Sequence, residues 1–137
     1  AAIASPNPDL AEAVRRTGIE PQLHTVSADD LPARVRVEVE SMLGHVEGTI
    51  AVVAPRDQLQ RWNDTLDQVL GSHERVKLLD GLDTKGLEFD AVVLIDPDGV
   101  VAESAAGWRT LYVVLTRATQ RLVTLGTSAA WLDTLNP

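Results

Sequence analysis

Residues 91–95 read Ala-Val-Val-Leu-Ile, an unbroken run of apolar side chains. A second run, Thr-Ile-Ala-Val-Val-Ala at residues 49–54, stops at Pro55. Short apolar runs without polar alternation are typical of strands that are buried on both faces, as they are in a parallel sheet covered by helices. These two runs therefore predict an α/β fold with a mostly parallel sheet and helices on both of its faces.

The segments around these two runs alternate between strand patterns and helix patterns. Further strands are predicted at residues 22–26, 76–79 and 122–125, and helices at residues 31–43, 56–70, 111–118 and 128–135. For the helix at residues 31–43 a strand is the alternative prediction, because residues 34–40 alternate perfectly between polar and apolar side chains. Helix is favoured because Leu31, Val35 and Val39 lie on one helical stripe that ends before Gly44.

The N-terminal part of the chain carries the weakest pattern. Residues 1–20 are expected to be a poorly structured tail, although Asn7 and Pro8 also fit the start of a short helix that runs through Arg16. Residues 21–137 are expected to form a single domain. The chain begins without an initiator Met, which suggests a piece of a longer protein.

The composition excludes several functional classes. The chain has 137 residues and no cysteine, which excludes a disulfide scaffold, a thiolate metal site and a cysteine nucleophile. No apolar run approaches the ~18–20 residues of a membrane-spanning helix, so a cytoplasmic domain without membrane contact is expected. The 12 Lys and Arg against 20 Asp and Glu give a net charge of −8, which argues against a stand-alone nucleic-acid binder. The three histidines lack ligand spacing, and no metal site is predicted within the chain.

Two segments combine chemically active side chains with a turn or a helix end. Residues 83–90 bring a Lys, a Gly and a Glu together directly before a buried strand, and the apolar helix at 111–118 presents Thr116 and Arg117 near its end. Taken alone, the first segment also fits a solvated loop, and Arg117 also fits an ion pair with one of the many Asp and Glu residues. Ligands of such sheets bind beyond the carboxyl ends of the strands, so the first segment is expected at that edge.

Taken together, the two segments resemble motifs V and VI of the UvrD/Rep-type superfamily 1 helicases. Residues 84–90 read T-K-G-L-E-F-D, residues 111–119 read L-Y-V-V-L-T-R-A-T, and their order and the strand between them match the family. The resemblance covers residues 49–127 or thereabouts. It implies a RecA-like three-layer sandwich, the C-terminal motor domain of an ATP-dependent DNA helicase or translocase.

The resemblance implies a role for each matching residue. Arg117 would be the catalytic arginine finger, which reaches the γ-phosphate of ATP bound between two RecA-like domains. Glu88 would lie at the ribose, and Gly86 would let the backbone approach the phosphates closely. The loop residues that would link the nucleotide site to the nucleic-acid track are Thr84 and Lys85, and those that would orient the Arg-bearing helix are Tyr112 and Thr116.

The chain lacks the part of an ATPase that cradles the phosphates. A phosphate-binding loop needs a lysine after a Gly-rich turn, and the only lysines, Lys77 and Lys85, do not fit that pattern. Asp96 ends an apolar strand as a magnesium-binding acid would, but it is expected to be a strand-end turn residue. The isolated chain is therefore predicted to be inactive. ATP and Mg²⁺ would be cofactors of a full-length parent, in which an N-terminal RecA-like domain completes the site.

One departure from the family pattern concerns the partner. Leu82 and Asp83 stand where the DNA-unwinding members usually have a histidine and a serine. The wording of both motifs is closer to the HelD branch, whose members are ATPases that act on bacterial RNA polymerase. DNA and RNA polymerase are both candidate partners of the parent protein. The isolated chain is expected to be monomeric.

Asp96 and Asp98 also allow an interpretation outside this family. They imitate the D-x-D loop of haloacid-dehalogenase-type phosphatases, and Thr127 would supply the phosphate-binding hydroxyl. That chemistry needs a lysine further along the chain, and none follows Asp98.

A non-catalytic docking module is the third alternative. Trp108 and Trp131 are its candidate exposed anchors. Trp62 lies on the apolar stripe of a predicted helix and is expected in the core.

Overall fold

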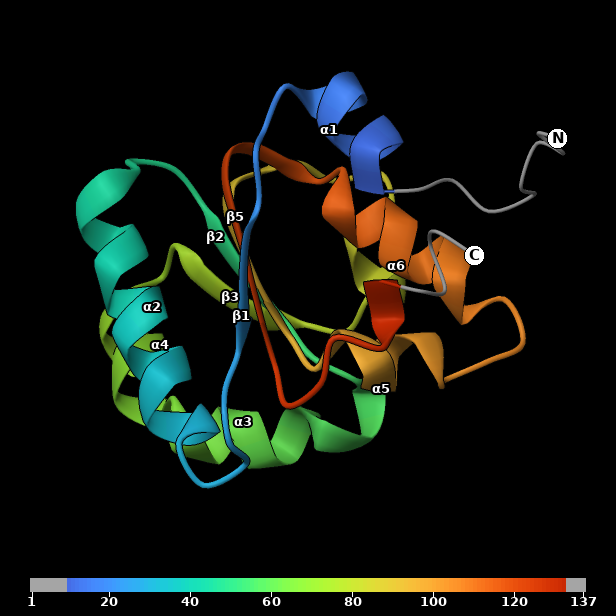
Figure 1. The fold of residues 1–137 in the computed structure, drawn as a ribbon. Coiled ribbons are helices and arrows are strands. Elements are labelled where there is room, and N and C mark those ends of the chain that lie inside the picture. Colours follow the sequence, from blue (N-terminus) through green and yellow to red (C-terminus); the bar gives the residue numbers. More distant parts are fainter. Residues whose placement is uncertain (1–9, 133–137) are drawn as a thin grey trace, which may run out of the picture.

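The computed structural model describes residues 10–132, which form three layers with a sheet in the middle (Figure 1). Within these residues the sheet has five strands: β1 Gln22–Thr25, β2 Ile50–Val53, β3 Val76–Leu79, β4 Phe89–Ile95 and β5 Ala118–Gly126. The helices are α1 Leu10–Thr17, α2 Leu31–His45, α3 Leu59–Thr65, α4 Asp67–Ser72, α5 Pro97–Val101 and α6 Gly107–Leu115. Two 3₁₀ turns, η1 Arg56–Gln58 and η2 Leu82–Thr84, follow β2 and β3.

All neighbouring strands are parallel, in the order β1-β5-β4-β2-β3. β4 pairs with both β2 and β5, so Val93 lies between Val52 and Val123. Residues 91–95, which form most of β4, are completely buried. The predicted α/β class and the parallel sheet are confirmed, and each of the five predicted strands is present, although β4 and β5 begin before the predicted residues 91 and 122.

The helices divide between the two faces of the sheet (Figure 1). On one face the core joins residues of α2 and α3 with Val52 and Val93, and on the other it joins residues of α1, α5 and α6 with Val53 and Val92. Successive residues of a strand point to opposite faces, so each apolar run supplies side chains to both cores. Helices therefore cover both faces of the sheet, which gives the three-layer arrangement of an α/β fold.

The helix predictions on the first face are correct in type and only partly correct in extent. α2 is a helix and buries Val35 and Val39, as the stripe predicts. The single helix predicted at residues 56–70 is divided into η1, α3 and α4. The division between α3 and α4 lies at Leu66, whose φ of −102° and ψ of 14° interrupt the helical geometry. Trp62 is fully buried, as expected.

The helix predicted at residues 111–118 differs at both ends. α6 begins earlier, at Gly107, and ends earlier, at Leu115. The N–H groups of Thr116 and Arg117 donate to carbonyls only three residues back, at 3.1 Å each, which tightens the last turn. The chain can therefore enter β5 directly after Arg117.

The N-terminal stretch contains α1. This helix buries Ala13 in the second core and contacts α6, and Gly18 ends it with a φ of +73°. The expectation of a poorly structured tail at residues 1–20 is therefore wrong for the part that forms α1. The helix start predicted at Asn7 lies outside the described residues.

Of the closing helix predicted at 128–135, only the first part lies within the described residues, where 131–132 are helical. Trp131 is buried in the second core, so the prediction of an exposed anchor is wrong for this residue. Trp108 is half-buried, and the guanidinium carbon of Arg109 lies 5.0 Å from the centroid of its ring. No helix in residues 10–132 is both long and apolar enough to cross a lipid bilayer.

Candidate functional site

Glu88 and Arg117 lie at the amino ends of two neighbouring strands. Glu88 directly precedes β4 and Arg117 directly precedes β5, and the first residues of these strands, Phe89 and Ala118, are paired in the sheet. The sequence places the segment at residues 83–90 at the carboxyl edge of the sheet, and this prediction is wrong for Glu88. The strands are parallel, so the chain that leaves the carboxyl end of β3 has returned to the amino edge when it reaches Glu88.

Neutral acceptors hold the side chain of Arg117. Its Nε donates to the carbonyl oxygen of Val113 at 3.1 Å, its Nη1 to that of Leu87 at 3.3 Å, and its Nη2 to Thr116 Oγ1 at 3.2 Å. The last turn of a helix leaves carbonyl groups unpaired, which is why the end of α6 offers acceptors here. Neither of the two ion pairs within residues 10–132 involves Arg117, so no carboxylate of this region forms an ion pair with it.

Arg117 borders a pocket of about 370 Å³ at the amino edge of the sheet. The pocket is lined by Arg16, Thr17, Glu88, Thr116, Arg117, Ala118 and Thr119. Glu88 and Arg117, predicted from two separate segments, are thus brought to one site. Arg16 and Thr17 were missed, because only the packing of α1 against α6 brings them to this edge and no local pattern signals that packing.

The loop that leads to Glu88 is held by its own backbone and one buried hydroxyl. Thr84 is fully buried, and its Oγ1 donates to the carbonyl oxygen of Gly81 at 2.7 Å. Gly86 has a φ of +80°, a left-handed conformation that a residue with a Cβ adopts only with strain. Lys85 is exposed and lines a separate pocket of about 150 Å³ together with Arg109. Lys85 therefore does not line the pocket that Arg117 borders.

Thr116 and Tyr112, the two residues predicted to orient the helix that carries Arg117, have different surroundings. Thr116 Oγ1 donates to the carbonyl oxygen of Val113 at 2.9 Å while it accepts from Arg117, so it fixes one end of the guanidinium. Tyr112 packs against the second core, and its hydroxyl is buried without a hydrogen-bond partner within the described part of the chain. Thr116 thus contacts Arg117 directly, whereas Tyr112 contributes to packing.

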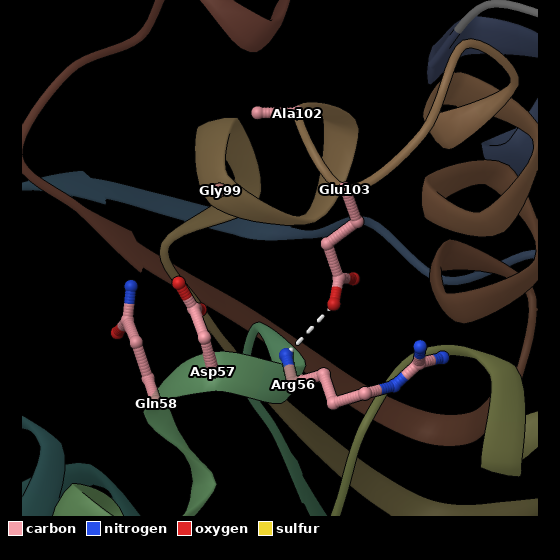
Figure 2. Close-up of a pocket in the computed structure, with 6 residues that line it drawn as sticks. All are labelled: Arg56, Asp57, Gln58, Gly99, Ala102 and Glu103. Atoms are coloured by element: carbon pink, nitrogen blue, oxygen red, sulfur yellow. Dashed lines mark hydrogen bonds between the residues drawn. The ribbon is translucent and has the colours of Figure 1, made fainter.

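A second pocket, of about 570 Å³, lies at the carboxyl edge, between the loops that follow β2 and β4 (Figure 2). Its walls include the backbone amide of Arg56, which donates to Glu103 Oε2 at 2.8 Å. The Arg56 side chain turns to Asp80, with 2.9 Å between Nε and Oδ2. The loops after β2, β3 and β4 are thereby cross-linked by side chains that already have partners.

The carboxyl groups at this edge differ in acidity. Burial by itself raises the pKa of Asp80. The hydrogen bonds from Arg56 and from the Asp83 N–H, with the charge of Arg56, outweigh burial and lower that pKa below its ordinary value. Burial raises the pKa of Asp98, and the charge of Asp96 adds to this, although the N–H of Trp131 opposes it. Asp80 is thus stabilised as an anion, whereas Asp98 is not.

Asp96 is the strand-end turn residue that the sequence predicts. It has a φ of 52° and caps α5, since its Oδ1 accepts from the N–H of Gly99 at 3.1 Å. Its Oδ2 accepts from Gln58 Nε2 at 2.8 Å, and Gln58 Oε1 accepts in turn from Trp62 Nε1 at 3.1 Å. With both oxygens engaged in holding the fold, Asp96 is poorly placed to attack a phosphoryl group, so its geometry does not favour the phosphatase interpretation. Among residues 10–132 there is no group of three or more His, Asp or Glu side chains that could hold a metal ion.

Residues 83–125 match the family model of the UvrD-like helicase C-terminal domain. Among solved structures, the C-terminal domain of a possible DNA helicase from Lactobacillus plantarum WCFS1 is similar with a TM-score of 0.65 and 17% identity, over 96% of this chain and 95% of that one. The arterivirus nonstructural protein 10, a helicase, is similar with a TM-score of 0.55 and 12% identity, over 88% of this chain and 31% of that one. No curated protein sequence matches the chain.

The matched residues 83–125 contain both of the segments on which the resemblance to UvrD/Rep-type helicases rests. The resemblance is therefore confirmed for this part of the chain, while nothing in the comparisons supports the HelD branch. At 12–17% identity the similarity to the two solved structures concerns the fold. The chain has the RecA-like α/β fold, and its residues 83–125 are similar to the C-terminal domain of UvrD-like helicases.

Proposed function

We infer that the chain is the C-terminal motor domain of an ATP-dependent superfamily 1 helicase or translocase. In this function Arg117 contacts the γ-phosphate of ATP and Glu88 contacts the ribose. The observation that carries the inference is the shared pocket at the amino edge of the sheet, where these two residues meet and where Arg117 has no carboxylate partner within the described residues.

The environment of Arg117 suits an arginine finger. Three of its five N–H donors are held by two backbone carbonyls and by Thr116 Oγ1, all neutral acceptors at 3.1–3.3 Å. Charge-assisted hydrogen bonds to phosphate oxygens are shorter and roughly twice as strong as bonds to neutral groups, so Arg117 gains when an anion replaces them. In the transition state it would stabilise the negative charge on the transferring phosphoryl group.

The rest of the site must come from elsewhere in a parent protein. The phosphate-binding loop and the ligands of Mg²⁺ would belong to an N-terminal RecA-like domain, and Mg²⁺ bound there would neutralise part of the phosphate charge. Thr116 positions Arg117, Gly86 shapes the loop before Glu88, and Lys85 with Thr84 would connect this site to the nucleic-acid track. The chain alone should not hydrolyse ATP, and phosphate release by the chain above a heat-inactivated blank would contradict this assignment.

Arg117→Ala in the full-length parent tests the role of the arginine finger. ATP turnover is expected to fall by about 10³, with ATP binding largely retained, because the contact is made mainly in the transition state. Arg121→Ala is the matched control, since Arg121 is a nearby arginine that lies on β5 and does not line the pocket. Unchanged turnover in Arg117→Ala would mean that Arg117 is only structural.

A HelD-type ATPase that acts on RNA polymerase is the second candidate. Leu82 is 57% exposed beside the exposed Asp83, and an apolar and an acidic side chain suit a protein surface better than a phosphate backbone. Binding titrations of the parent with single-stranded DNA and with RNA polymerase separate the two candidates. Binding to DNA alone would reject the second one.

A further inference from the structure

We propose that Arg16 is a second phosphate-contacting residue of the pocket that Arg117 borders, an extension that rests on the nucleotide-binding function proposed above. The ligand class is a polyphosphate, such as the triphosphate of a nucleotide. Arg16 lies far from both motif segments in the sequence, and it reaches the pocket from the last turn of α1.

The last turn of α1 is held firmly enough to position a side chain. The N–H of Gly18 donates to the carbonyl oxygen of Val14 at 2.7 Å, and Thr17 Oγ1 donates to that of Ala13 at 3.0 Å. Thr17 Oγ1 also accepts from the N–H of Ile19 at 3.0 Å, which fixes the turn into the following segment. The backbone that carries Arg16 is therefore anchored on both sides of this residue.

The pocket offers an anion little else than its two guanidinium groups. The hydroxyls of Thr17, Thr116 and Thr119 each donate to a backbone carbonyl, at 3.0, 2.9 and 3.3 Å. The ion pairs within residues 10–132 include neither Arg16 nor Arg117. Two guanidinium groups that form no ion pair inside residues 10–132, beside the single carboxylate of Glu88, give the pocket an excess of positive charge on a chain whose net charge is −8. A polyphosphate carries enough negative charge to neutralise both cations, whereas a single carboxylate can neutralise only one of them.

The alternative is a purely structural role for Arg16 at the end of α1, and such a role predicts that Arg15 and Arg16 are equivalent. A cation in the last turn of a helix interacts favourably with the helix dipole, and Arg15 and Arg16 share that position. Arg15, however, lines another groove, with Leu10, Val14 and Leu23. The two arginines are equivalent for the helix and differ only in the pocket they face, so Arg15 is the matched control.

The test is a titration of the isolated chain with tripolyphosphate, followed by NMR at low ionic strength. The chain should bind tripolyphosphate with a dissociation constant in the millimolar range. Arg16→Gln should weaken binding about tenfold, which is the loss of one charge-assisted contact, and Arg16→Lys should recover part of it. Arg15→Gln should stay within about twofold of the wild type, the loss expected for an exposed charge outside the pocket. Thermal unfolding of each variant confirms that it is folded.

The outcomes distinguish the role proposed here for Arg16 from the role proposed above for Arg117. Equal losses in Arg16→Gln and Arg15→Gln, or no binding by the wild-type chain, would overturn the role of Arg16. If only Arg117→Gln weakens binding, the role of Arg16 is wrong while that of Arg117 stands. If only Arg16→Gln does so, the assignment of Arg117 fails instead. A loss of affinity for single-stranded DNA but not for tripolyphosphate would reassign Arg16 to nucleic acid and overturn the inference.

Discussion

Gly107 sets the distance between α5 and α6, and replacing it with alanine should destabilise the chain strongly. A Cβ at this position would lie 2.5 Å from the carbonyl carbon of Val101 and 2.8 Å from its Cα, with the carbonyl oxygen closer still. All three atoms belong to the backbone, so no side-chain rotation can relieve the overlap. The start of α6 must move away from Val101, and α6 carries Leu111 and Val114 into the second core.

The size of the effect follows from this geometry. Overpacking a well-packed core typically costs 1–3 kcal/mol, and an overlap with backbone falls at the upper end of that range. The higher helix propensity of alanine offsets at most about 1 kcal/mol. Gly107→Ala should therefore lower the free energy of unfolding by about 2–3 kcal/mol. For a domain of this size the unfolding temperature should fall by roughly 10 °C.

Circular dichroism during thermal and urea unfolding measures both quantities. Gly44→Ala is the matched control, because Gly44 lies in the last turn of α2 and a Cβ there would meet open space. The same chemical change should stabilise the chain at this position by about 0.5–1 kcal/mol. If the unfolding temperature of Gly107→Ala lies within about 2 °C of the wild type, the free energy of unfolding has changed by less than about 1 kcal/mol, and the packing explanation is refuted. A fall in both variants would refute it as well.

The remaining predictions concern the carboxyl groups at the other edge of the sheet. The pKa of Asp80 is lowered in the folded state, so its ionised form adds stability above the unfolded value of about 3.8, and that stability is lost as the pH falls through the folded pKa. Asp80→Asn should destabilise the chain at pH 7 and progressively less as the pH falls below about 3.8; urea unfolding that shows equal losses at pH 7 and pH 3 would contradict this. The pKa of Asp98 is raised, so ionisation weakens the folded state above that pKa, and the penalty disappears as the pH falls below the unfolded value. Asp98→Asn should therefore be at least as stable as the wild type at pH 7, and a clear loss of stability there would show that the carboxylate is required.

The strands could be predicted from the sequence because their signal is local. Residues 91–95 and 50–53 are apolar throughout, and both segments are buried on both faces of the sheet. The ends of elements depend on contacts that no local pattern records. β5 starts at Ala118, in a stretch where the exposed Thr119 and Gln120 give no apolar signal, because pairing with β4 extends the strand there. Leu66 keeps its place on the apolar stripe while its backbone leaves the helix.

Glu88, Thr116 and Arg117 were predictable from the motifs, whereas Arg16 and Thr17 were not. The edge of the sheet at which Glu88 and Arg117 lie was predictable as well. In a parallel sheet each strand begins at the amino edge, so a residue that directly precedes a strand must lie there. Glu88 and Arg117 both precede predicted strands. The rule that ligands bind at the carboxyl edge applies to residues that follow strands, such as Arg56 and Asp96, and was the wrong rule for this pair.

The two edges of the sheet differ in whether their charges are already satisfied. At the carboxyl edge, the Arg56 side chain binds Asp80 and its backbone N–H donates to Glu103. Both oxygens of Asp96 accept hydrogen bonds as well, so an incoming ligand would have to displace existing contacts. At the amino edge, Arg117 is held only by neutral acceptors, and Arg16 has no ion pair within the described residues. Arg117 is half-buried, and a half-buried cation without an anion is costly to keep, because its desolvation is not compensated. That imbalance, which the motifs alone do not reveal, is the physical reason to expect the phosphate ligand at the amino edge.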